Sequence, residues 1–255
     1  MGTQQTHPVD ALLHTENLPT IWCPGCGIGI VVNTFIQTLK RMKIKKDKIV
    51  IISSGLSCTG KISHHLSLKN IIVEKPFDEA KKFKEKNPQS KVIVFFSDSD
   101  LMVSSIDGLL DVCDKGTDIC AIYINSFVCS TLFFHKKFTD FNFSRKDRKF
   151  EPKAVFNLPH LLKNHGASYI ARWTPLHCRR LSYSIKEGIL KPGFSFIEVI
   201  SPCLMYYASR GCEGNNIDRM GNYLKNATIE NGHPVENLYT EEMEHIIIGK
   251  FLDRA

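Results

Sequence analysis

Two cysteines near the start of the chain have a spacing that suits metal or redox chemistry. Cys23 and Cys26 lie three positions apart around a Pro-Gly pair, in the segment Trp22-Cys23-Pro24-Gly25-Cys26-Gly27. A turn of this kind lets both sulfurs face one metal centre. A thioredoxin-like redox pair is the competing interpretation, but that motif should follow a strand of a βαβ unit. Only 21 residues precede Trp22 in this chain, which disfavours the redox pair.

Two further cysteines could complete a site with four thiolates. Cys58 follows an expected strand at 49–53, and Cys203 follows another expected strand at 194–200. If these strands are parallel, both thiols emerge at the same edge of the sheet. Four thiolates suit either a structural zinc ion or a [4Fe-4S] cluster, and ligand type alone does not decide between them.

The other five of the nine cysteines lie mostly within apolar patterns. An odd number of cysteines in a chain of this length does not indicate a disulfide framework. We therefore expect the remaining ones to be small buried hydrophobic residues. They are Cys113, Cys120, Cys129, Cys178 and Cys212.

An acidic pair, Asp98 and Asp100, directly follows the apolar run at 91–96. Carboxylates in this position can serve as the N-cap and first-turn charge of a helix. Their oxygens are also the ligands that Mg²⁺ prefers. The pair taken alone leaves both interpretations open.

The elements that would position these residues alternate along the chain. Five short runs are apolar on both faces, as strands buried between helix layers should be, at 48–53, 91–96, 120–125, 168–171 and 194–200. Helical patterns lie at about 28–42, 78–86, 101–113, 158–164 and 175–190, and one more helix could lie at 241–252. This alternation predicts an α/β fold with a doubly wound, mostly parallel sheet flanked by helices.

Length and composition indicate one folded domain. The chain has 255 residues, of which 43% are hydrophobic and 10% aromatic, enough for a full core. No repeat or linker divides it, so we expect a single domain over 1–255, with a core at about 10–210 and a C-terminal tail at 211–255. The chain has no apolar run of membrane length and no signal pattern at its start. We therefore expect a cytoplasmic protein with no membrane partner.

The formal net charge of +7, from 33 Lys and Arg against 26 Asp and Glu, is compatible with an acidic partner or with no partner at all. Basic and aromatic residues interleave at 135–138 and 145–150, as they do in single-strand nucleic-acid binders. No other feature matches a nucleic-acid-binding module. We expect no nucleic-acid partner.

Taken together, the motifs resemble those of the beta subunit, the thiamine-diphosphate-binding subunit, of 2-oxoacid:ferredoxin oxidoreductases. Pyruvate and 2-oxoglutarate ferredoxin oxidoreductases belong to this family. The similarity covers roughly residues 10–225 and keeps the order and spacing of four cysteines. The matching segments are 18–29 (LPTIWCPGCGIG), 54–59 (SGLSCT), 91–94 (KVIV), 191–198 (KPGFSFIE) and 201–203 (SPC).

The resemblance implies a thiamine-diphosphate-binding-type domain in which Cys23, Cys26, Cys58 and Cys203 hold a [4Fe-4S] cluster close to thiamine diphosphate. It implies oxidative decarboxylation of a 2-oxoacid to acyl-CoA, with electrons passing through the cluster to ferredoxin. The implied partners are coenzyme A, ferredoxin and an alpha subunit, with gamma and delta subunits as further candidates. Because the carboxylate that activates the cofactor comes from the alpha subunit in this family, no catalytic residue is expected on this chain alone.

The family binds the cofactor's diphosphate through Mg²⁺, using a GDGD motif and an Asn about 28 positions later. Here the motif reads Ser97-Asp98-Ser99-Asp100, and Ser126 stands 28 positions after Asp98, with Asn125 beside it. The resemblance thus implies Asp98, and Asn125 as its neighbour in the pattern, as Mg²⁺ ligands. The implied cofactor-binding residues are Cys58, Thr59, Asp98, Asp100 and, through its backbone carbonyl, Val128.

Two hypotheses about function follow. In the first, the chain is an enzyme subunit that binds the cluster and Mg²⁺-thiamine diphosphate. In the second, it is a non-catalytic relative that keeps the cluster cysteines and acts as a structural or electron-transfer subunit. The second hypothesis rests on the serines at 97, 99 and 126, which replace two glycines and the metal-binding Asn of the family.

Overall fold

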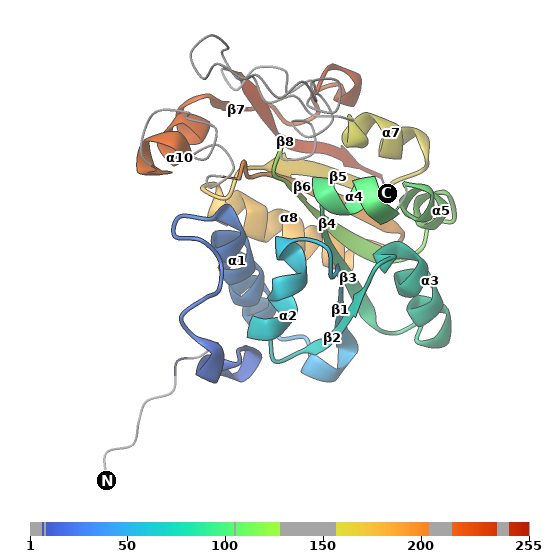
Figure 1. The fold of residues 1–255 in the computed structure, drawn as a ribbon. Coiled ribbons are helices and arrows are strands. Elements are labelled where there is room, and N and C mark those ends of the chain that lie inside the picture. Colours follow the sequence, from blue (N-terminus) through green and yellow to red (C-terminus); the bar gives the residue numbers. More distant parts are fainter. Residues whose placement is uncertain are drawn as a thin grey trace, which may run out of the picture.

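A sheet of eight strands forms the centre of the molecule, in the order β2-β1-β3-β4-β6-β5-β8-β7 (Figure 1). The structure is a computed structural model. It describes residues 7, 9–104, 106–127, 157–203, 216–238 and 245–254. For 102–104 and 216–220 it describes the backbone only.

Six neighbouring strands of the sheet are parallel. In spatial order they are β2 (Lys69–Val73), β1 (Ile49–Ser54), β3 (Lys91–Ser97), β4 (Ile119–Asn125), β6 (Phe194–Ile200) and β5 (Tyr169–Trp173). Every residue of β1, β4, β5 and β6 is buried, because these strands have helices on both faces. The predicted doubly wound α/β fold is confirmed.

Helices cover the two faces of the sheet as separate layers (Figure 1). One layer holds α1 (Gly27–Met42), α2 (Ile62–His65) and α8 (Cys178–Leu190). The other holds α3 (Pro76–Lys86), α5 (Asp107–Asp114) and α7 (Leu158–Asn164). The short helix α4 (Asp98–Ser104) follows β3 directly, and α10 (Asn216–Lys225) lies toward β7. None of the helices in the described part is long and apolar enough to cross a membrane.

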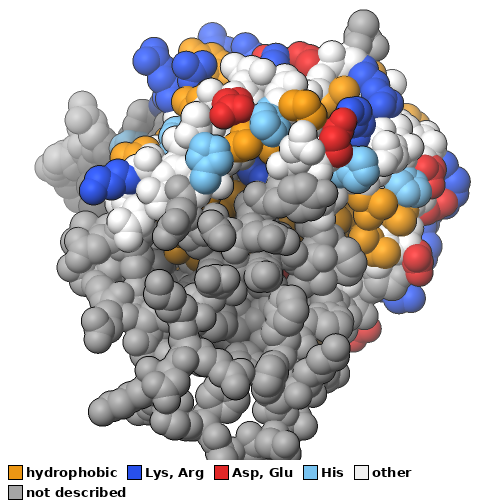
Figure 2. Space-filling model, turned by 90° about the horizontal axis from the view of Figure 1, so that it is seen from above, with side chains coloured by type: hydrophobic (Ala, Val, Ile, Leu, Met, Phe, Trp, Pro, Cys, Tyr) orange, Lys and Arg blue, Asp and Glu red, His pale blue; other side chains and the backbone are white. Residues whose placement is uncertain are grey.

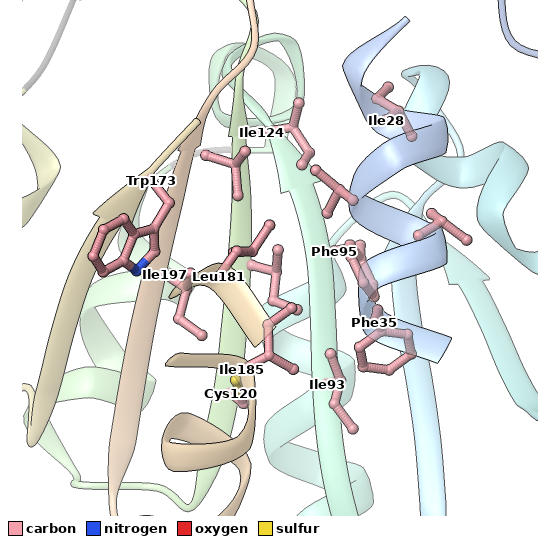
Figure 3. Packing of buried hydrophobic residues seen from close by; sticks show 14 of the residues in the cluster. Ile28, Phe35, Ile93, Phe95, Cys120, Ile124, Trp173, Leu181, Ile185 and Ile197 are labelled. Atoms are coloured by element: carbon pink, nitrogen blue, oxygen red, sulfur yellow. The ribbon is translucent and has the colours of Figure 1, made fainter. Parts of the chain in front are cut away.

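The strand period of two residues divides the core between the layers. Ile93 and Phe95 of β3 point toward α1, where Phe35 meets Phe95 edge-on with ring centroids 5.2 Å apart. Figure 3 shows Leu181 and Ile185 of α8 on this same side of the sheet. All five side chains are completely buried, so the layer of α1 and α8 is fixed tightly to the sheet.

The C-terminal segment differs from the prediction. A helix was expected at 241–252, but Ile246–Asp253 forms strand β8, antiparallel to β5 and parallel to β7 (Ala227–Ile229). The prediction was wrong because β8 satisfies the free backbone groups at the edge of β5. Gly249 has a φ of +151°, and a Cβ there would lie 2.9 Å from the Glu230 carbonyl oxygen. A φ of this value does not occur in an α-helix.

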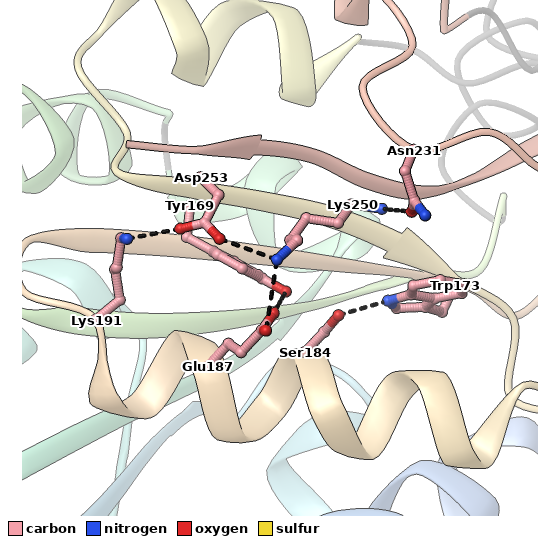
Figure 4. A network of polar contacts seen from close by, with 8 residues as sticks. All are labelled: Tyr169, Trp173, Ser184, Glu187, Lys191, Asn231, Lys250 and Asp253. Atoms are coloured by element: carbon pink, nitrogen blue, oxygen red, sulfur yellow. Dashed lines mark hydrogen bonds and ion pairs between the residues drawn. The ribbon is translucent and has the colours of Figure 1, made fainter. Parts of the chain in front are cut away.

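Polar side chains also attach β8 to the neighbouring elements (Figure 4). The Lys250 ammonium lies 3.4 Å from a Glu187 oxygen on α8 and 2.9 Å from an Asp253 oxygen. The Tyr169 hydroxyl of β5 donates to Glu187 at 2.8 Å, and Lys191 pairs with Asp253 at 2.6 Å. This network joins β5, β8 and α8 at the surface.

A buried ion pair holds the middle of the sheet together. Arg172 of β5 and Glu198 of β6 are directly opposed in the register, and the Arg172 Nε donates to Glu198 Oε2 at 2.7 Å. Both side chains are only 2% exposed. Asn125, at the end of β4, donates its amide nitrogen to Glu198 Oε1 at 2.8 Å. Three adjacent strands are therefore linked by one carboxylate.

The cysteines outside the predicted four-thiolate site are of two kinds. Cys113 and Cys120 are buried, as predicted, and burial raises the pKa of each thiol to about 12. Cys178 is exposed at the start of α8, so the prediction of a buried residue was wrong there. Cys129 and Cys212 lie outside the described residues.

We expect the substitution Arg172→Leu to lower the free energy of unfolding by about 3–5 kcal/mol, because it leaves the Glu198 carboxylate buried without its cation. Guanidinium denaturation measures this change. Lys250→Met is the control, since it removes a cation from partly exposed pairs and should cost less than about 1 kcal/mol. Equal losses in the two variants would contradict a special role for the buried pair.

Candidate functional site

The candidate site lies at the edge where the parallel strands end, because their carboxyl ends all meet there. Cys58 follows β1, Asp98 follows β3, Ser126 follows β4 and Cys203 follows β6. The last two segments contact each other directly, since the Cys203 N–H donates to the Ser126 carbonyl at 3.0 Å. The chain thus brings residues far apart in the sequence to one edge, as the sequence predicted for Cys58 and Cys203.

The first cysteine pair forms a turn at the start of α1. The Cys26 N–H donates to the Cys23 carbonyl at 2.9 Å, and Gly25 between them has a φ of +78°. Gly27 follows as the first residue of α1, and a Cβ there would lie 2.1 Å from the Ser201 hydroxyl. Only glycine therefore allows the cysteine turn to approach the segment that leads to Cys203.

A tryptophan and a histidine connect the cysteine turn to the Cys58 segment. The Trp22 indole N–H donates to the Cys58 carbonyl at 3.1 Å. The Trp22 ring lies 4.8 Å from the His65 ring, whose Nε2 accepts from the Ile21 N–H at 3.2 Å. His65 is only 1% exposed. The sequence analysis missed this contact, because nothing in the order of residues pairs position 22 with position 65.

Of the four predicted cluster cysteines, Cys26 is affected by the other three. Burial raises the pKa of the Cys26 thiol, and negative charge on Cys58, Cys203 and Cys23 raises it further. Cys23 and Cys58 are exposed, whereas Cys26 and Cys203 are half-buried. Across the described ranges, no three His, Cys, Asp or Glu side chains are close enough together to hold a single metal ion.

Asp100 is the centre of a hydrogen-bonded cluster beside the cysteines. Its Oδ2 accepts from the Ser57 hydroxyl at 2.7 Å, the Thr59 hydroxyl at 3.2 Å and the Ser97 N–H at 2.7 Å. The Asp100 side chain is only 1% exposed. It therefore ties both neighbours of Cys58 to the end of β3.

Asp98 makes the corresponding contact with the end of β4. Its Oδ1 accepts from the Ser126 hydroxyl at 2.5 Å and from the Ser126 N–H at 3.1 Å. Ser126 is the residue brought to Asp98, whereas the Asn125 amide nitrogen is directed to Glu198. The assignment of Asn125 as a Mg²⁺ ligand remains a prediction. Val128, the other expected contact, lies outside the described residues.

The edge thus has two chemically different halves. The thiols of one half are ligands for zinc or an iron–sulfur cluster. The carboxylate and hydroxyl oxygens of the other half are ligands for a hard cation such as Mg²⁺. Serine hydroxyls line this second half, where the Ser97 and Ser99 oxygens lie 3.1 Å apart. A site of this composition can hold a charged cofactor beside a metal centre.

Fold and site define a doubly wound α/β protein with thiols and carboxylates at the carboxyl edge of its sheet. No protein-family model matches the chain. The 2-oxoglutarate synthase subunit KorB of Methanocaldococcus jannaschii is 30% identical, over 97% of this chain and 92% of that protein. The KorB subunit of Methanothermobacter marburgensis is 31% identical, over 97% and 87%. The chain belongs to the beta-subunit family of 2-oxoacid:ferredoxin oxidoreductases, which confirms the resemblance found in the sequence.

A similar fold is found in a solved structure. A chain of the 2-oxoglutarate:ferredoxin oxidoreductase from Magnetococcus marinus, with 2-oxoglutarate, coenzyme A and succinyl-CoA bound, superposes with a TM-score of 0.73. The match covers 99% of this chain and 87% of that chain at 16% identity. At this identity the similarity establishes the shared fold.

The buried His65 predicts a pH dependence of stability. Burial, with the nearby charge of His64, lowers the pKa of His65 in the folded chain. The unfolded state therefore binds the proton more readily, so the free energy of unfolding should fall as the pH drops below about 6.5 and level off below the folded-state pKa. Guanidinium unfolding at several pH values between 5 and 8 measures this fall.

The variant His65→Gln keeps a hydrogen-bond acceptor but does not titrate, so its stability should fall less over the same pH window. His64→Gln is the matched control, because His64 is the adjacent, exposed histidine. His177, whose pKa burial also lowers, contributes equally to all three proteins. The same fall in the wild type and in His65→Gln would show that His65 is not responsible.

Proposed function

We propose that this chain is the cluster-binding and thiamine-diphosphate-binding subunit of a 2-oxoacid:ferredoxin oxidoreductase. The reaction converts a 2-oxoacid and coenzyme A to acyl-CoA and CO₂ and passes two electrons to ferredoxin. 2-Oxoglutarate is the first candidate substrate, because the relatives at 30% and 31% identity are 2-oxoglutarate synthase subunits. Pyruvate is the second candidate.

The observation that carries the proposal is the arrangement of the four cysteines. The Cys23–Cys26 turn meets the Cys58 segment through the Trp22 indole, which donates to the Cys58 carbonyl at 3.1 Å, and it meets the segment leading to Cys203 at Gly27, where a Cβ would lie 2.1 Å from the Ser201 hydroxyl. Thiolates suit either zinc or a [4Fe-4S] cluster. Transfer of electrons to ferredoxin favours the cluster, because zinc has no redox chemistry.

The oxygen-rich half fits Mg²⁺ and the diphosphate of the cofactor. Asp98 would supply a carboxylate ligand, and Ser126 would place a hydroxyl beside it. Thr59 is oriented by its hydrogen bond to Asp100, beside Cys58. Thiamine diphosphate, when bound, supplies the stabilisation of a carbanion that decarboxylation requires. This chain's own contribution is to hold the cofactor next to the cysteines.

Other chains complete the proposed enzyme. The residue that activates the cofactor would come from an alpha subunit, as the resemblance to the family implies. The net charge of +7 would favour docking of an acidic ferredoxin. Gamma and delta subunits are further candidates.

The first test is anaerobic purification followed by iron, sulfide and zinc analysis. We expect about four iron atoms per chain, the content of one [4Fe-4S] cluster. Cys203→Ala should lose most of this iron because it removes a ligand. Cys178→Ala is the matched control, because it removes an exposed thiol that lies on α8, outside the cluster set. Zinc, or equal iron in both variants, would contradict the cluster assignment.

The second test concerns the cofactor. Asp98→Asn removes the proposed ligand charge and should weaken binding of Mg²⁺-thiamine diphosphate at least about ten-fold, since even indirect partners of a metal contribute that much. Calorimetry on the complex with the alpha subunit measures this affinity. Asp107→Asn is the control, because Asp107 also lies in the first turn of a helix but is exposed. Iron without any cofactor binding in the wild type would instead identify a non-catalytic relative.

A further inference from the structure

The outer surface between α1 and α8 has a cleft that the proposed cofactor chemistry does not use. Its volume is about 620 Å³. It is lined by Asn33, Thr34, Gln37, Thr38 and Arg41 of α1, and by Cys178, Arg179, Ser182, Tyr183 and Lys186 of α8. The spacing of three and four residues places each set on one face of its helix, so the cleft runs along both helices.

The charge of this cleft has one sign. Arg41, Arg179 and Lys186 line it, and no carboxylate does. None of these three cations forms an ion pair with any residue that the structure describes. By contrast, acidic and basic side chains are interspersed among the visible described residues of the face seen in Figure 2. The cleft is therefore a local excess of positive charge.

The floor of the cleft is uncharged and already hydrogen-bonded. The hydroxyls of Thr38 and Ser182 are 2.7 Å apart and both residues are buried. The Arg41 guanidinium donates to the Ser182 hydroxyl at 3.5 Å. The cations thus stand at the rim above a floor that needs no further partner.

We propose that this cleft binds an acidic segment of the alpha subunit with which the chain assembles. The inference rests on the proposed function for the existence of that subunit. Tyr183, which is 58% exposed, lies among the cations. Exposed Tyr and Arg together are typical of protein interfaces, where aromatic and guanidinium groups contribute most of the binding energy.

The dimensions favour a polypeptide over a small anion. From Asn33 to Arg41 the cleft follows α1 for about 12 Å, at 1.5 Å per residue, which matches two turns of a helix. Its cations stand on opposite walls at an exposed rim, so they could contact several carboxylates along one segment. A second copy of this chain is disfavoured, because a two-fold contact would bring the same cations together in a chain of net charge +7.

The test uses the full chain and the purified alpha subunit. The double variant Arg41→Glu with Arg179→Glu should reduce the association rate constant at least about ten-fold and weaken its dependence on salt, because it reverses the charge that steers the partner. Lys40→Glu with Arg180→Glu is the matched control. These two cations lie on the same helices and are exposed, but they do not line the cleft.

A second readout locates the contact directly. Cys178 is exposed and lines the cleft, so a bound segment should slow its modification by a maleimide at least about ten-fold. Mass spectrometry distinguishes this thiol from the others, and unchanged iron content and thermal unfolding in both double variants show that the fold is intact.

The possible outcomes distinguish a failure of the proposed function from a failure of the proposed docking site. If the wild-type chain does not bind the alpha subunit, the proposed function fails. If it binds, but the charge-reversed and control variants associate alike or Cys178 reacts equally fast in the complex, the cleft is not the contact. If inorganic phosphate or coenzyme A alone protects Cys178 while the alpha subunit does not, the cleft binds a small anion and the inference is overturned.

Discussion

The arrangement of the site depends on two carboxylates in the first turn of one short helix. Asp98 and Asp100 begin α4, where the parallel strand β3 ends, and each receives hydrogen bonds from a different neighbouring strand end. Asp100 holds the residues that flank Cys58, and Asp98 holds Ser126. Both carboxylates are almost completely buried, and a buried charge is retained only where such donors compensate it. The strand ends therefore cannot move independently of one another.

The thiols gain their positions from this hydrogen-bonded edge. Cys58 is held from one side through Asp100 and from the other through the Trp22 indole, which donates to its carbonyl. Cys203 is held through the Ser126 carbonyl, and Cys26 approaches it because Gly27 has no side chain. The sulfur half and the oxygen half of the edge are thus parts of one framework.

Two serines at the predicted cofactor site, Ser97 and Ser126, have a structural role in this chain. Ser97 donates both its N–H and its hydroxyl to Asp100, and Ser126 donates both of its groups to Asp98. The hydroxyls of these two serines therefore add side-chain donors to the two carboxylates. Asn125, one position earlier, belongs to the buried network of Glu198 and Arg172. Neighbouring residues of a strand end point to opposite sides, which explains why Ser126 and Asn125 have different partners.

The amino-acid sequence alone predicted the α/β class, most strands and helices, and the family. It also predicted that Cys58 and Cys203 lie at the same edge of the sheet. These features follow from local hydrophobic periodicity, from motifs and from the rule that parallel strands end together. Only the tertiary structure decided that Ile246–Asp253 is a strand, because its partner β5 is remote in the sequence. It also decided that His65 and Trp22 meet and that a basic cleft lies between α1 and α8. Contacts of this kind depend on how elements pack across long sequence separations, and local sequence patterns carry no record of them.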